Sequence, residues 1–124
     1  MDSLIVDMNR ILGMYTKNVN MVVQSTIDTT ARDTAQKLRA TSPKAPGGGL
    51  YAKNWAVKKE NGYDVVYNKA PSYRLTHLLE NGHDIVYNGE KVGHSPAQPH
   101  IKPVEEWVQD ELPKRLEEAL GNVT

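Results

Sequence analysis

The feature that most constrains the fold is a long helical repeat in the first third of the chain. From Leu4 to Leu38, apolar residues recur at spacings of three or four. This period predicts an amphipathic α-helix over residues 3–40. Pro43 stops it, because the residue before a proline is pushed out of the helical region of backbone space.

The predicted length of this helix conflicts with a compact domain. At about 1.5 Å per residue, the helix would extend roughly 57 Å. A compact chain of 124 residues has a radius of gyration of only about 14 Å. The helix must therefore either break or project and pack on another copy. The expected break is residues 24–30, because they are rich in β-branched and hydroxyl side chains and the period slips there by one residue.

The middle of the chain predicts short strands and loops. Residues 41–50 contain three consecutive glycines and are expected to form a mobile loop. Residues 50–59 and 62–68 are predicted to pair as a hairpin, because Asn61-Gly62 between them is a strong turn signal. Tyr51, Trp55 and Val57 would share one face of it.

A short helix is predicted over residues 73–81, with Gly82 as its C-terminal cap. Residues 84–88 then predict a strand that ends at a second tight turn, Asn88-Gly89. Residues 89–99 are interpreted as another loop.

The last predicted element is a helix over residues 103–120, with Pro103 in the favoured first position. The internal Pro113 predicts a kink or break near Glu111. The whole chain, 1–124, is thus predicted to be a single α+β domain. It would combine a long N-terminal helix with a small antiparallel sheet of about three to four strands and a short helix within 50–102.

Composition excludes several classes of protein. Cysteine is absent, so disulfides, thiol catalysis and cysteine-ligated metals are excluded. Fifteen basic and fifteen acidic residues cancel, which argues against a dedicated nucleic-acid binder. The sequence contains no apolar run long enough to span a membrane, and its N-terminus lacks the cationic start of a secretion signal. We therefore expect an intracellular domain. Residues 41–102 carry eight bases and five acids, whereas 103–124 carry two bases and six acids, which would suit head-to-tail contact between copies or a solvated acidic helix.

Two chemical alternatives compete with purely structural roles. The four histidines could hold a metal with Glu80 and Asp84, although their spacings of 6, 11 and 6 match no common zinc pattern. No serine or threonine has the sequence setting of a nucleophile, so no enzyme activity, catalytic residue or cofactor is predicted. Basic residues interleaved with aromatic ones could form a weak nucleic-acid surface: Lys53, Lys58, Lys59, Lys69 and Arg74 with Tyr51, Trp55 and Tyr67.

Two further stretches carry a resemblance to a known family. They are Tyr73-Arg-Leu75-Thr76-His77-Leu78-Leu79-Glu80-Asn-Gly82-His83 and Pro99-His100-Ile101-Lys-Pro103. With Ser42-Pro43, the Tyr51 to Trp55 segment and Val66-Tyr-Asn68, they resemble the minor tail component, or tail-completion (head–tail joining), family of long-tailed bacteriophages and prophages. The resemblance covers roughly residues 30–110.

The resemblance implies a structural virion protein and not an enzyme. Members close the tail tube or join it to the head, as rings around the DNA path, and a hexamer is favoured. It implies partners among tail-tube and head-completion proteins, DNA passing without sequence readout, and location in the virion neck after assembly in the host cytoplasm. Leu75, Leu78 and Leu79 would be core anchors, His77, Glu80 and His83 polar organisers, and Pro99-His100 the start of the last helix.

Two loops are the expected interfaces in such a ring. They would be mobile in the free protein and order against a neighbour. Their residues are Pro43, Gly47, Gly48 and Gly49 in the first loop and Lys91, Gly93 and His94 in the second, which spans residues 89–98.

Overall fold

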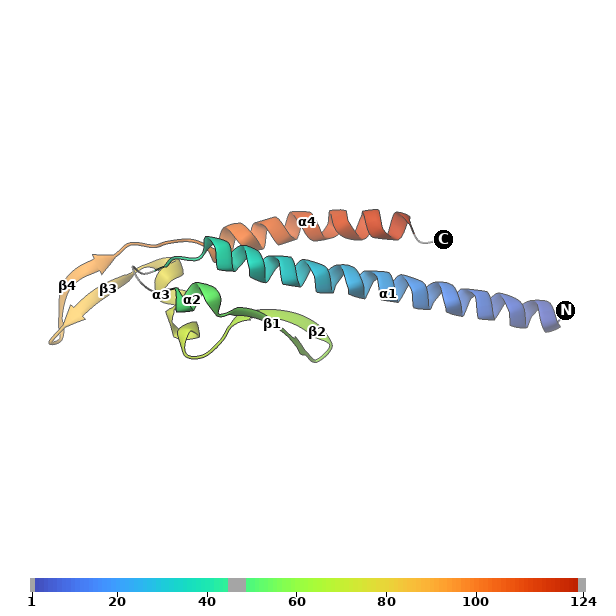
Figure 1. Cartoon of the computed structure of the whole chain (residues 1–124), viewed down its shortest axis with the longest axis horizontal. Helices are drawn as coiled ribbons and strands as arrows, with labels where there is room; N and C mark the ends of the chain where they lie inside the picture. The colour runs from blue at the N-terminus through green and yellow to red at the C-terminus, as the bar shows by residue number, and fades with distance from the viewer. Residues whose placement is uncertain (1, 45–48, 123–124) are drawn as a thin grey trace.

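A computed structural model describes residues 2–44 and 49–122, with the side chains of the first helix described from Met8 onward. The architecture is α+β, as predicted, and the molecule is elongated (Figure 1). The elements follow in the order α1 (Asp2–Thr41), α2 (Leu50–Lys53), β1 (Trp55–Glu60), β2 (Tyr63–Asn68), the 3-10 helix η1 (Ser72–Leu75), α3 (Thr76–Asn81), β3 (His83–Tyr87), β4 (Glu90–Ser95) and α4 (Ile101–Gly121).

Helix α1 is continuous, so the predicted break over residues 24–30 is wrong. Three threonines in and after this segment bond their hydroxyls to the carbonyl four residues earlier. Thr26 donates to Val22 at 2.8 Å, Thr30 to Thr26 at 2.7 Å, and Thr34 to Thr30 at 2.7 Å. In this geometry the hydroxyl is satisfied within the helix and does not divert the backbone out of it.

The second long helix, α4, runs antiparallel to the C-terminal half of α1 (Figure 1). At about 1.5 Å per residue, the 40 residues of α1 extend about 60 Å and the 21 residues of α4 about 32 Å. The Arg115 guanidinium fixes this pairing through the Asp33 carboxylate at 2.7 Å. Because α4 is shorter, α1 projects beyond it, and we call the described projecting part, Met8–Val22, the overhang.

Helix α4 differs from its prediction at two points. It begins at Ile101, two residues before Pro103, and it continues through Pro113, so the break expected near Glu111 is not observed. The early start has a physical cause, since a carboxylate from another element accepts the first backbone N–H groups, as described below.

The strands form two separate hairpins and not one sheet of three to four strands. β1 pairs with β2 and β3 with β4, each antiparallel. Both predicted turns are confirmed, because Asn61-Gly62 and Asn88-Gly89 have the positive φ angles of tight hairpin turns. Two predictions here are wrong: Tyr51 lies in α2 and not in a strand, and most of the expected loop 89–99 is strand β4.

The core is small and lies where α1, α2, β1 and the start of α4 meet. Its buried apolar side chains are Leu38, Tyr51, Trp55 and Val104, with Val66, Leu79 and Ile101 packed against them. No large side chain in the described part of the chain is completely shielded from solvent. The chain thus buries little apolar surface for its length.

A buried hydroxyl satisfies the core tryptophan and provides a test of this packing. Trp55 Nε1 donates to Ser42 Oγ at 2.8 Å, and the same hydroxyl donates to the Leu38 carbonyl. We expect Ser42→Ala to lower the free energy of unfolding by about 1–3 kcal/mol, because it leaves a buried N–H without an acceptor. The matched control is Thr41→Ala, whose exposed hydroxyl makes the same kind of bond to Lys37. Urea unfolding with equal losses for both variants would contradict this role of Ser42.

Candidate functional site

The family-like segment 73–83 contributes one strong organising residue, Glu80 at the end of α3. Its Oε1 accepts the backbone N–H groups of His100 at 2.8 Å and Ile101 at 3.0 Å, and its Oε2 accepts that of Lys102 at 3.1 Å. The first N–H groups of a helix have no partners within the helix, and negative charge is favoured there. Glu80 therefore caps α4 from a distance of 20 residues in sequence.

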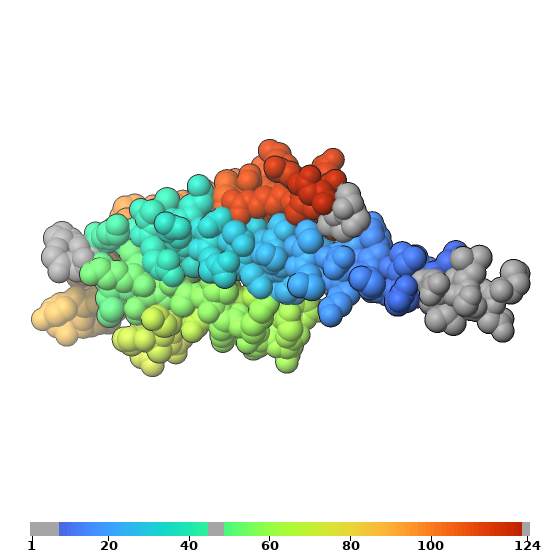
Figure 2. All heavy atoms as spheres, turned by 45° about the vertical axis from the view of Figure 1, so that its right-hand side comes forward, coloured from blue at the N-terminus to red at the C-terminus, as the bar shows by residue number. Residues whose placement is uncertain are grey.

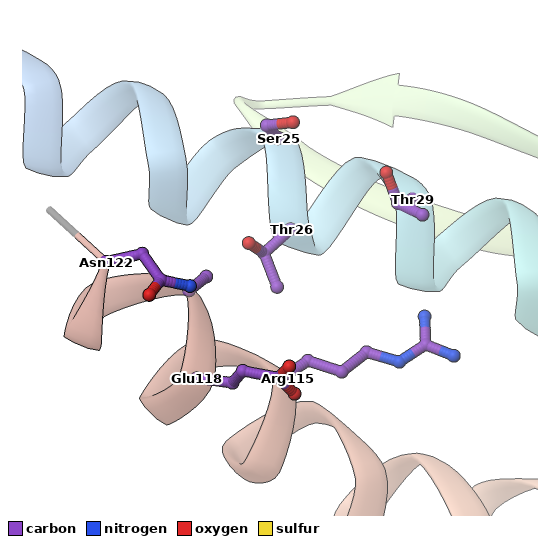
Figure 3. Close-up of a pocket in the computed structure, with 7 residues that line it drawn as sticks. Ser25, Thr26, Thr29, Arg115, Glu118 and Asn122 are labelled. Carbon is purple, nitrogen blue, oxygen red and sulfur yellow. The ribbon is translucent and has the colours of Figure 1, made fainter.

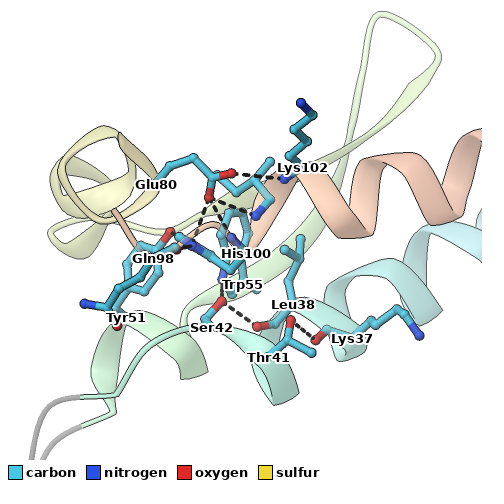
Figure 4. A network of polar contacts seen from close by, with 11 residues as sticks. Lys37, Leu38, Thr41, Ser42, Tyr51, Trp55, Glu80, Gln98, His100 and Lys102 are labelled. Atoms are coloured by element: carbon cyan, nitrogen blue, oxygen red, sulfur yellow. Dashed lines mark hydrogen bonds and ion pairs between the residues drawn. The ribbon is translucent and has the colours of Figure 1, made fainter. Parts of the chain in front are cut away.

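Further bonds join the same two segments (Figure 4). The Gln98 backbone N–H donates to the Leu79 carbonyl at 2.7 Å. The buried His100 ring lies between Glu80, the Gln98 carbonyl and the Tyr51 hydroxyl, which is 2.6 Å from its Nε2. We call Glu80, Gln98 and His100 the clasp. It closes the base of the β3–β4 excursion, residues 82–97, and so fixes where that hairpin leaves the body.

The clasp predicts a specific dependence of stability on pH. Burial alone would raise the pKa of Glu80, but the three backbone N–H bonds outweigh it and the pKa is lowered. The stabilisation is therefore present above the unfolded-state pKa near 4.5 and is lost as pH falls through the lower folded-state value. We expect Glu80→Gln to lose stability at pH 7 and to flatten this acid limb, measured by thermal unfolding against pH.

The control for this prediction is Glu105→Gln, which removes an exposed carboxylate from the next turn of α4. It should leave the acid limb in place. An acid limb of unchanged steepness in Glu80→Gln would show that the clasp carboxylate is not its source.

The remaining residues of the segment are mostly exposed. Of the three predicted core anchors only Leu79 packs on the core, whereas Leu75 and Leu78 are exposed in the single chain, so that expectation is wrong for both. His77 is also exposed, and His83 Nδ1 is buried without a hydrogen-bond partner among the described residues. The other matched positions lie as follows: Tyr73 is exposed in η1, Thr76 begins α3, Gly82 ends it, Pro99 precedes the clasp histidine, and Pro103 lies in the first turn of α4.

The predicted interface loops have a different structure from the one expected. Pro43 is half-buried and Gly49 precedes α2 with φ 141°, whereas Gly47 and Gly48 lie outside the described residues. The prediction of a second loop is wrong, because its three named residues belong to strand β4: Lys91, Gly93 and His94.

Hydrogen bonds stabilise one face of the outer hairpin, the name we give to β3–β4. Lys91 Nζ and His94 Nδ1 lie 3.2 Å and 3.0 Å from Asp84 Oδ1. Bonds from His94 and Lys91 lower the pKa of Asp84. This face is thus occupied by a polar network of the hairpin itself.

The outer hairpin and the overhang lie at opposite ends of the molecule (Figures 1 and 2), and both expose large apolar side chains. At one end, the outer hairpin exposes apolar side chains, with Tyr87 69% accessible, and no helix of the described chain packs extensively on it. At the other end, the overhang exposes residues such as Leu12, which is 60% accessible. The full sets are Ile85, Val86, Tyr87 and Val92 on the hairpin, and Met8, Ile11, Leu12, Met14, Tyr15 and Met21 on the overhang.

A groove marks the point where α4 ends and the overhang begins (Figure 3). It is open and lined by side chains from the middle of α1 and the last turns of α4: Ser25, Thr26, Thr29, Arg115, Glu118, Ala119 and Asn122. The apolar stripe formed by Met8, Leu12 and Tyr15 continues the α1 face that α4 covers, because residues three and four apart share a helix face. The overhang therefore extends a packing face past the end of its partner.

The two chemical alternatives gain no support from this geometry. No group of three or more histidine or carboxylate side chains lies close enough to hold a metal ion in residues 2–44 and 49–122. Tyr51 and Trp55, expected to stack on bases, are buried. Lys59 is held by Asp28 and Asp64 at 2.7 Å and 3.0 Å. None of the helices in the described chain has the length and apolar character needed to cross a membrane.

Searches against protein-family models, curated proteins and solved structures find no match to this chain. The length of the first helix left a projection as one of two options beside the break, whereas the exposed apolar side chains of the outer hairpin were not predicted. The run of three apolar residues Ile85-Val86-Tyr87 was the available signal, and the expected loop at residues 89–99 concealed its partner strand.

Proposed function

We propose that this chain is a structural subunit of a phage or prophage virion that assembles with copies of itself at the head–tail junction. One observation carries the proposal: large apolar side chains are exposed at both ends of an elongated chain with a small core. Monomeric proteins rarely expose contiguous apolar patches of this kind, and such patches mark protein–protein contacts. The sequence resemblance over residues 30–110 supplies the virion setting.

The placement of the patches supports a ring. Contacts between two different patches are heterologous, and they close into a ring when the rotation between neighbours divides a full turn. The outer hairpin and the overhang point away from the body in opposite directions (Figure 1), so the hairpin of one copy can reach the overhang of the next. In this proposal a hexamer is favoured, DNA passes through the ring without sequence readout, and the ring contacts tail-tube and head-completion proteins.

Genetic removal tests this function. The coding sequence is deleted from the phage or prophage genome that carries it, and the particles are examined by electron microscopy. We expect heads and tails that are not joined, or tails of irregular length, and normal virions when the chain is supplied from a plasmid. Normal, infectious virions from the deletion would overturn the proposal.

A further inference from the structure

Two of the exposed surfaces described above are complementary in both apolar character and charge. One is on the outer hairpin of β3–β4 and the other is on the overhang of α1. If the chain assembles as proposed above, their complementarity indicates which surfaces of neighbouring copies meet.

The outer hairpin has two unlike faces. Side chains alternate between faces along a strand, and directly paired residues share one face. Ile85 is paired with Gly93 and Tyr87 with Glu90, so these residues lie on one face, whereas Asp84 and its polar network lie on the other. The first face, which we call the docking face, thus exposes Ile85 and Tyr87 and carries one acid, Glu90, whereas Val86 lies on the other face beside Lys91.

Glu90 is available for a partner. It is exposed and makes no salt bridge with any residue in the described part of the chain. Gly93 adds no side chain to the docking face beside Ile85, and a Cβ placed there would make an ordinary contact of 3.6 Å with Ile85 Cδ1. An apolar surface of this form, with one acid at the turn end, fits a partner that is apolar and basic.

The overhang has a face of that composition. Arg10, Met14, Lys17 and Met21 are spaced four, three and four residues apart, so they lie on one side of the helix, which we call the basic flank. Both methionines are 61% exposed, and Arg10 and Lys17 are the only charged residues between Met8 and Val22. Methionine side chains adapt readily to different partner surfaces.

We propose that the docking face of one copy packs on the basic flank of the next copy, with Glu90 beside Lys17. The alternative, in which two overhangs pair with each other, would leave the docking face and its one acid, Glu90, uncovered. Heterologous packing covers both the docking face and the basic flank, which lie at opposite ends of the elongated molecule.

Cross-linking between single-cysteine variants tests this contact, because the chain contains no cysteine. Met14→Cys and Tyr87→Cys, one of them ¹⁵N-labelled, are mixed and treated with a short bismaleimide, and the covalent dimers are identified by mass. We expect the mixed dimer to exceed either self-dimer at least tenfold. Lys69→Cys, exposed and distant from both surfaces in sequence, replaces either variant as the control for random collision.

The outcomes separate this contact from the proposed function on which it rests. If native mass spectrometry shows oligomers but the mixed cross-link does not form, the contact is wrong and self-assembly stands. The same holds if the Met14→Cys self-dimer dominates the cross-linked products. A protein that stays monomeric at all concentrations overturns self-assembly as well.

Charge exchange provides a second readout that does not depend on cross-linking. Lys17→Glu and Glu90→Lys should each weaken association several-fold, and the double variant should restore it, because the pair is reversed and not removed. Failure of the double variant to recover, with monomer unfolding unchanged, overturns the assignment of Glu90 to Lys17.

Discussion

Replacing Gly82 with alanine should destabilise the chain more than the same substitution at any other described glycine. Gly82 has φ 75°, a left-handed conformation that costs a residue with a Cβ roughly 1–2 kcal/mol. A Cβ there would also lie 2.7 Å from the Ser95 carbonyl oxygen and 2.8 Å from the Ala97 nitrogen, both backbone atoms. Because backbone cannot move aside without opening the clasp, we expect a total loss of about 3 kcal/mol or more in the free energy of unfolding.

The matched control for Gly82→Ala is Gly89→Ala at the tip of the outer hairpin. Gly89 has φ 79°, nearly the same conformation, but a Cβ placed on it would meet no atom within 4 Å beyond its immediate neighbours. We expect a loss of only about 1–2 kcal/mol there. Urea unfolding of both variants measures the difference, and equal losses would show that the backbone contact at the base of the hairpin has no energetic importance.

Placing an aspartate on the basic flank of the overhang should abolish assembly and leave the single chain folded. In Met14→Asp a charge replaces a side chain that is 61% exposed, so the folded chain loses little. In an assembly that buries this position, the variant loses the burial of a methionine, about 1.5–3 kcal/mol, and gains the cost of a buried charge. We expect association to weaken at least a hundredfold, measured by analytical ultracentrifugation.

Asn20→Asp is the control for this second effect. It adds the same charge to the same helix, on the polar side that also carries Asn9 and Thr16. Its association should remain within a few-fold of that of the unmodified chain. If Met14→Asp associates as well as Asn20→Asp, the basic flank does not lie in the assembly interface.

The elements with strong local signals could be predicted from the sequence. The period of α1 and the two Asn-Gly turns depend on residues close in sequence, and all three are confirmed. The predicted break in α1 is wrong because a threonine hydroxyl can either compete with the helical backbone or donate to the carbonyl four residues earlier. Thr26 and Thr30 do the second. Strand β4 was missed because Gly93 and Ser95 have the composition of a loop, and only pairing with β3 makes them a strand.

The clasp and the docking face depend on tertiary contacts and could be predicted only in part. Glu80 and His100 were expected to be organising and structural residues, but no spacing rule brings a carboxylate to a helix start 20 residues away. The apolar docking face needed the register of β3 against β4, which sets Tyr87 and Glu90 on one side. Sequence patterns therefore identified the segments involved, whereas their contacts depend on the tertiary structure: Glu80 with the start of α4, and β3 with β4.

In the proposed assembly, the chain is an incomplete unit whose exposed apolar ends are covered by other copies. Native mass spectrometry of the purified protein over a range of concentrations measures whether such an assembly forms. We expect one closed species at an integer multiple of the 13.8 kDa chain mass, with a hexamer favoured. A stable 13.8 kDa monomer at every concentration would contradict it.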